Sequence, residues 1–121
     1  MQEELDLYIG TEEISSLKPV KVKIEDVRID EIGSKKSKKL VCICKHPQKE
    51  GLEISSAKLE VNGKLEVYGL WINRDSGGFI RKNSALAIFL KHLECNKISE
   101  IIGKEIHTTH NNKGYLVFKA Y

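Results

Sequence analysis

Alternation of apolar and charged residues, with one change of phase, constrains the fold of this chain most. Val20, Val22 and Ile24 alternate with lysines at the spacing of a half-buried strand. Glu25 and Asp26 follow, and the apolar alternation then resumes in the opposite phase. A β-bulge at this point would restore the inward register and bend the strand, as small barrels require at their corners. The pattern therefore predicts a long, bent first strand.

A lysine-rich polar segment and a second apolar segment come next. Residues 33–39 are expected to form a polar loop, because they contain Gly33, two serines and four lysines. Residues 40–44 are apolar and β-prone, and the chain reaches Pro47 soon afterwards. The sequence therefore predicts a second strand that starts at Leu40.

Residues 52–73 have the pattern of a β-hairpin around Asn62 and Gly63. A two-residue Asn-Gly turn would place Leu59 opposite Glu66 and put apolar residues on opposing faces. A three-residue loop that also includes Val61 pairs apolar with apolar residues and lysines with glutamates. The three-residue loop is therefore the favoured prediction.

A helical pattern follows a flexible loop at residues 75–78. Ser84 is a candidate N-cap, and the apolar residues after it recur at the spacing of one helix face, namely Leu86, Phe89, Leu90 and Leu93. One amphipathic helix is expected over residues 84–95. Asn96 is a candidate cap for a short second helix that ends at Gly103. A closing hairpin is expected from residues 104–110 and 115–121, because strong turn formers occupy positions 111–114.

These elements predict a mainly β protein with one or two short helices. The expected architecture is a small OB-like antiparallel barrel, closed or partly open, with a helix between the third or fourth strand and the C-terminal hairpin. Four strand-like segments precede the helix, one more than the OB order contains. The hairpin at residues 52–73 must therefore supply an extra strand or lengthen one strand across its turn.

The chain of 121 residues, 40% hydrophobic and 31% charged, has the size and composition of one folded domain. Residues 1–17 carry five acids and no Lys or Arg, so we expect an acidic leader followed by a single domain at 18–121. This second part holds 20 bases and 12 acids, a net charge of +8 that suits a polyanionic partner. The short apolar runs and the acidic N-terminus predict a cytoplasmic protein that does not enter membranes.

The sequence resembles the OB-fold-like single-stranded DNA-binding proteins of phages and prokaryotes. The similarity lies in a short acidic leader, the segment VKIEDV at residues 22–27, the Ser84-Ala85-Leu86 helix start, Ile102-Gly103-Lys104, and Gly114-Tyr115 before the last strand. The resemblance implies a protein that holds oligonucleotides across its second and third strands, between the loop after the first strand and the loop between the last two strands. It favours DNA over RNA and largely sequence-independent binding.

Basic and aromatic residues lie at the positions that such binding needs. Phosphate contacts are predicted from Lys35, Lys36, Lys38, Lys39, Arg74, Arg81, Lys82 and Lys113. Base stacking is predicted from Tyr68, Trp71, Phe79 and Tyr115, with Trp71 as the leading candidate. Equally, Trp71 and Phe79 have the character of core residues, and the lysine loop that of a solvated turn. Tyr68 and Trp71 are three positions apart and face opposite sides of a strand unless Gly69 marks a bulge.

Other chemistry has less support in the sequence. Cys42, Cys44 and His46 share one strand face, but their spacing is unusual for zinc, so no metal or other cofactor is expected. No nucleotide-binding, serine-hydrolase or metalloprotease motif is present, which predicts a protein that is not an enzyme. The alternative function is a protein-interaction module, such as an accessory subunit or a virus-encoded inhibitor, that contacts a partner or a second copy through an exposed strand edge.

Overall fold

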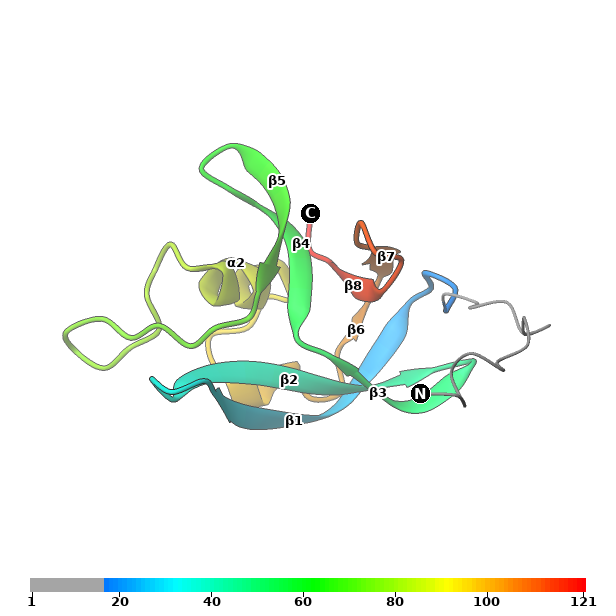
Figure 1. Ribbon diagram of the computed structural model, residues 1–121, viewed down its shortest axis with the longest axis horizontal. Helices are drawn as coiled ribbons and strands as arrows, with labels where there is room; N and C mark the ends of the chain where they lie inside the picture. The colour runs from blue at the N-terminus through cyan, green and yellow to red at the C-terminus, as the bar shows by residue number, and fades with distance from the viewer. Residues whose placement is uncertain (1–16) are drawn as a thin grey trace, which may run out of the picture.

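The computed structural model describes residues 17–121, so nearly all of the predicted acidic leader lies outside the described residues (Figure 1). The first of two four-stranded sheets has the order β3-β2-β1-β6. Its strands are β1 (Val22–Ile32), β2 (Ser37–His46), β3 (Lys49–Ile54) and β6 (Glu105–Ile106). All pairings within this sheet are antiparallel.

The second sheet has the order β5-β4-β8-β7. Its strands are β4 (Ser56–Val61), β5 (Lys64–Gly69), β7 (Thr108–His110) and β8 (Leu116–Lys119). The β4–β8 pair is parallel, and the other two pairs are antiparallel. The chain passes between the sheets three times, from β3 to β4 across Ser55, from β5 to β6 through residues 70–104, and from β6 to β7 across His107. Figure 1 shows the hairpin β4–β5 rising from the first of these junctions.

The bulge predicted in the first strand is confirmed. The register of β1 against β2 shifts between Ile24 and Asp26, and the ladder then continues as far as Ile32 and Ser37. The start predicted for the second strand is wrong, because β2 begins three residues before Leu40. In this extension residues of opposite charge lie across from each other, Asp30 from Lys39 and Glu31 from Lys38. Lys38 and Lys39 therefore belong to a strand, and only residues 33–36 form the turn.

The three-residue loop predicted for the β4–β5 hairpin is also wrong. The structure has a two-residue turn, in which Val61 pairs with Lys64 and Leu59 lies opposite Glu66. Asn62 and Gly63 have φ angles of 52° and 79°, as the type I′ turn favoured in two-residue hairpins requires. Apolar pairing did not decide the register because no side chain of β5 is fully buried.

The helical predictions are confirmed in their essentials. Helix α2 (Ala85–His92) starts at Ser84, whose side chain accepts a hydrogen bond from the Ala87 N–H at 3.2 Å. The helix ends three residues earlier than predicted, with Leu93 as its C-cap. A short 3₁₀ helix, η1 (Ile98–Ile101), precedes Gly103, which has the expected left-handed φ of 91°. No helix in the described part of the chain is long and apolar enough to cross a membrane.

Both sheets and helix α2 contribute to one hydrophobic core. Its fully buried side chains include Ile24, Leu40, Leu59, Leu70, Leu86, Phe89, Ile101 and Phe118. Phe89 of the helix stacks on Phe118 of β8 with ring centroids 5.0 Å apart. The helix therefore packs against the inner side of the second sheet.

Candidate nucleic-acid interface

One continuous row of side chains points outward from β5 and from the segment that follows it. We call Leu65, Val67, Gly69 and Trp71 the outward row. Of the residues between them, Leu70 is fully buried and Tyr68 and Ile72 pack against the core, whereas Glu66 is exposed. Beyond Gly69 the strand continues by pairing with β2, since Lys39 and Trp71 form an antiparallel bridge. Gly69 is therefore not a bulge, and the period of two runs unbroken through it.

Trp71 lies against the backbone of Gly69 on this outer face. A β-carbon placed on Gly69 would lie only 2.7 Å from Trp71 Nε1, so glycine is what allows the indole to occupy this place. Lys39 Nζ lies 4.9 Å from the centre of the indole ring, which is cation–π contact. The indole is half-buried and keeps part of its surface free. Trp71 is therefore not part of the hydrophobic core, and it lies on the outer face beside a cation.

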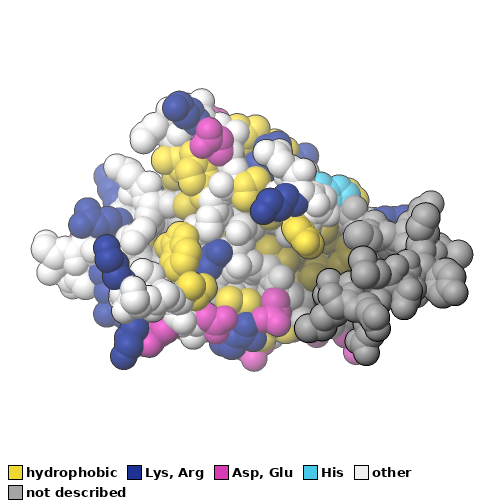
Figure 2. All heavy atoms as spheres, viewed as in Figure 1, with side chains coloured by type: hydrophobic (Ala, Val, Ile, Leu, Met, Phe, Trp, Pro, Cys, Tyr) yellow, Lys and Arg dark blue, Asp and Glu magenta, His cyan; other side chains and the backbone are white. Residues whose placement is uncertain are grey.

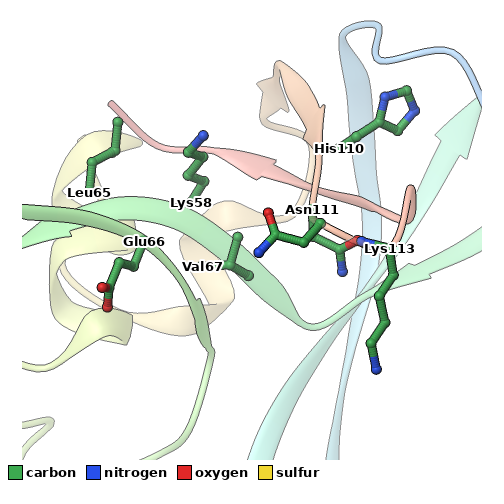
Figure 3. A pocket seen from close by; sticks show the side chains of 8 residues that line it. Lys58, Leu65, Glu66, Val67, His110, Asn111 and Lys113 are labelled. Atoms are coloured by element: carbon green, nitrogen blue, oxygen red, sulfur yellow. The ribbon is translucent and has the colours of Figure 1, made fainter.

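The start of the outward row forms one wall of a groove of about 550 Å³. Figure 3 shows Lys58, Leu65 and Val67 pointing to one side of the hairpin, whereas Glu66 points to the other. The opposite wall is the β7–β8 turn, which contributes His110, Asn111, Asn112 and Lys113. This groove combines the apolar side chains of Leu65 and Val67 with amides and with charged groups of both signs, whereas the His110 imidazole points away from it toward Leu17.

Most of the predicted phosphate-binding residues gather at the other end of the row. The Ile72 N–H donates to the Lys38 carbonyl at 2.8 Å, which places the β1–β2 turn beside the start of the loop at residues 73–83. The bases on these two segments are Lys35, Lys36, Lys38, Lys39, Arg74, Arg81 and Lys82. Figure 2 shows lysines and arginines along this side of the molecule and hydrophobic side chains in the middle of the face.

The remaining predicted residues lie elsewhere. Lys113 and the exposed Tyr115 belong to the β7–β8 turn, toward the opposite side of the view in Figure 1, so the predicted basic residues do not all line one groove. Tyr68 is on the inner side of the hairpin, where partial burial and then Glu66 raise the pKa of its phenol. Phe79 is 73% exposed at the tip of its loop and is not part of the core.

The outer face of β1, β2 and β3 carries charge of both signs. Arg28 makes hydrogen bonds to both carboxylate oxygens of Asp30, at 2.7 and 3.0 Å, and a further one to Glu53. These contacts cross over Val41, which is 6% exposed although it points outward. The Arg28 guanidinium holds the pKa of Asp30 below its usual range. The face that the OB resemblance assigns to nucleic acid is therefore occupied by an ion-paired network.

Cys42, Cys44 and His46 share one face of β2, as predicted, but all three point into the core. Burial raises the pKa of the Cys44 thiol to about 12 and also raises that of Cys42. The Gln48 N–H donates to His46 Nδ1 at 3.0 Å, so His46 Nε2 carries the proton and donates to the Lys18 carbonyl at 2.7 Å. Within residues 17–121, no three metal-ligating side chains are grouped to hold an ion.

His107 is exposed, but His110 is half-buried, and its Nε2 lies 2.7 Å from the Leu17 carbonyl oxygen. Together with His46, it fastens the start of the described chain to the two sheets. This bond holds one end of the groove wall in place.

Seven of the eight residues that line the groove were not predicted as site residues: Lys58, Leu65, Glu66, Val67, His110, Asn111 and Asn112. Counting back from Trp71 in steps of two would have found Val67 and Leu65, because a strand repeats its facing every second residue. Lys58 follows from the correct turn, since it is the cross-strand partner of Val67. No comparable pattern identifies Asn111.

The chain was compared with models of known protein families, with curated proteins and with solved structures, and none of the three comparisons finds a match.

Proposed function

We propose that this protein binds single-stranded nucleic acid, DNA in preference to RNA, along the outward row. The observation that carries the proposal is Trp71, an accessible indole held against a glycine backbone beneath a lysine. Single-strand-binding surfaces combine aromatic rings on which bases stack with cations that follow the phosphates. Lys39 and Lys58 flank the row at two points, as the cross-strand partners of Trp71 and Val67.

Charge supports this path. The seven bases at the Trp71 end outnumber the acids on the neighbouring segments, which are Asp30, Glu31 and Asp75, and Asp30 is also paired with Arg28. A polyanion gains affinity from such a cluster by releasing its counterions. The proposed path therefore runs from the groove to the basic end, where Lys39 borders the ion-paired face of the first sheet beside Asp30.

We further propose that the two sheets form a partly open OB-type barrel. In support, β1 lies between β2 and β6, and the parallel β4–β8 pair joins the first strand of the hairpin to the last strand of the chain. If β3 with β4 and β6 with β7 are each counted as one bent strand, five strands follow one another in a ring. In this scheme β5 is the surplus strand, and it carries the outward row.

Titration with a single-stranded oligonucleotide tests the function directly. Trp71 is the one tryptophan of the chain, so its emission reports on the proposed surface alone. We expect quenching by dT12 at low salt, with an affinity that falls as salt rises by about 0.7 log units per log unit of salt for each phosphate contact. Binding of the matching duplex should be much weaker, because paired bases are not available for stacking.

Fluorescence anisotropy of a labelled oligonucleotide provides an independent readout. If neither quenching nor a rise in anisotropy occurs with single-stranded DNA or RNA at low salt, the proposal is wrong. Binding that does not respond to salt would also contradict it, since the lysines would then have no part in the interaction.

A second candidate function is addition of an extended peptide from a partner protein to the edge of β5. β5 is the outermost strand of its sheet, and Leu65 and Val67 are 43% and 39% exposed. Val61 and Lys64 form the hydrogen-bonded pair that closes the two-residue turn. Hydrogen-bonded and non-hydrogen-bonded pairs alternate along the ladder, so the N–H and C=O groups of Val67 point toward the free edge. Such an edge is a template for strand addition.

Val67→Pro tests this second candidate, and nuclease treatment separates it from the first. The substitution removes an edge N–H that the hairpin does not use, so β-augmentation should be lost. We expect a partner captured from nuclease-treated lysate by the wild-type protein to be absent with this variant. Complexes that disappear with nuclease treatment alone would assign the interaction to nucleic acid instead.

A further inference from the structure

Two loops far apart in the sequence share one hydrogen-bonding pattern. In the first loop, residues 75–79, Asp75 Oδ1 accepts from the backbone N–H groups of Gly77 and Phe79 at 2.9 and 3.0 Å. In the second loop, residues 111–115, Asn111 Oδ1 accepts from Lys113 and Tyr115 at 2.9 and 3.0 Å. We call them the Asp75 loop and the Asn111 loop.

Their backbones match as well. The first and last residues of each loop are joined by a backbone hydrogen bond of 2.8 Å, from Asp75 N to the Phe79 carbonyl and from Asn111 N to the Tyr115 carbonyl. The fourth residue is a left-handed glycine in both, with φ angles of 85° at Gly78 and 82° at Gly114. The fifth residue is aromatic in both loops. The two segments are therefore the same structural unit built twice.

The aromatic residue of each loop is exposed. Phe79 and Tyr115 are 73% and 69% exposed, the highest values among the large hydrophobic side chains of residues 17–121. Neither ring is needed for the core, and the hydrogen bonds of each loop fix the backbone that carries it. A rigid loop loses little entropy when its ring meets a ligand, so such rings are efficient contact groups.

The outward row connects the two loops. At one end Val67 shares a groove with Asn111 and Lys113. At the other end the strand runs from Trp71 to Asn73, which lines a second hollow of about 440 Å³ together with Asp75 and Arg81. From Val67 to Asn73 an extended chain spans roughly 20 Å. A bound strand lying on the row would thus reach one loop at each end.

We propose that the Asp75 loop and the Asn111 loop are paired clamps, in which Phe79 and Tyr115 each stack on one base near opposite ends of the bound strand. The proposal rests on the proposed function and adds a minimum ligand length to it. A strand that spans both loops gains from two linked contacts, whereas a shorter one engages a single loop. Trp71 would then hold the middle of the strand.

Oligonucleotide length tests the clamps. In Phe79→Ala and in Tyr115→Ala, the affinity for dT12 should fall roughly 5- to 150-fold, the range measured for loss of one stacked base. The affinity for dT3 should fall only about twofold in either variant, because the other loop can still receive it. If dT12 binds both variants as tightly as wild type while Trp71→Ala weakens binding, the clamps are wrong and the proposed function stands. If dT12 does not bind even the wild-type protein, the proposed function fails first.

The first residue of each loop provides matched variants. Asp75→Asn keeps the acceptor oxygen, as the Asn111 loop demonstrates, and removes a negative charge, so dT12 should bind more tightly. Asn111→Asp should have the opposite effect through the same chemistry. Asp75→Ala and Asn111→Ala remove the acceptor and should weaken dT12 binding with little change in melting temperature. Equal affinities for all four variants and the wild-type protein would overturn the proposal.

Discussion

Phe89→Ala is expected to remove about 3–5 kcal/mol of folding stability, the usual cost of deleting a buried phenylalanine. Phe89 is fully buried and stacks on Phe118, so the substitution leaves a cavity between helix α2 and the second sheet. A domain of this size has about 5–15 kcal/mol in total, and the variant should unfold at much lower urea concentration or temperature. Circular dichroism during urea and thermal unfolding provides the measurement.

Phe79→Ala is the matched control, because it is the same substitution at a ring that is 73% exposed. Its stability should stay within about 0.5 kcal/mol of the wild-type value. If Phe89→Ala unfolds at the same urea concentration as Phe79→Ala, the helix does not pack as described. Comparison of the two variants also distinguishes a phenylalanine that stabilises the core, Phe89, from one that is exposed at the surface, Phe79.

Trp71→Ala should reduce the affinity for single-stranded oligonucleotides by about 1–3 kcal/mol, the value of one stacked base. Trp71→Phe keeps an aromatic face and should lose less. Gly69→Ala should reproduce part of the loss without touching the tryptophan, because the added methyl group would lie 2.7 Å from Trp71 Nε1 and displace the indole. Anisotropy of a labelled oligonucleotide measures all three, since two of the variants have no tryptophan emission.

Tyr68→Phe is the control for these variants. Tyr68 comes from the same strand but turns toward the interior. The Tyr68→Phe variant should therefore bind single-stranded oligonucleotides with the affinity of the wild-type protein. A large loss in Tyr68→Phe, or none in Trp71→Ala, would place the interface on the other side of the hairpin.

Local signals in the sequence predicted several elements correctly. The bulge after Ile24 was predictable because a strand that buries one face needs an extra residue wherever its apolar alternation changes phase. The start of α2 was predictable because Ser84 and the apolar spacing after it agree. These features depend on neighbouring residues, and no distant contact overrides them.

Features that depend on distant contacts were not predictable. The register of β4 against β5 was wrong because the prediction assumed that β5 faces the core, whereas Leu65 and Val67 face outward. The division of the predicted basic residues between two ends of the molecule follows from the pairing of Trp71 with Lys39. The Asp75 loop, predicted to be flexible, is closed by side-chain hydrogen bonds that a composition of Ser and Gly does not reveal.

The hairpin β4–β5 also has a practical consequence for protein engineering. Its tip, Asn62 and Gly63, is exposed, and β5 places no fully buried side chain in the core. Exposed tips of this kind tolerate inserted residues, because the inserted chain disturbs neither packing nor buried hydrogen bonds. A peptide tag or a fluorophore inserted between Asn62 and Gly63 would therefore lie close to the outward row and could report on binding there. The insertion would leave the fold unchanged.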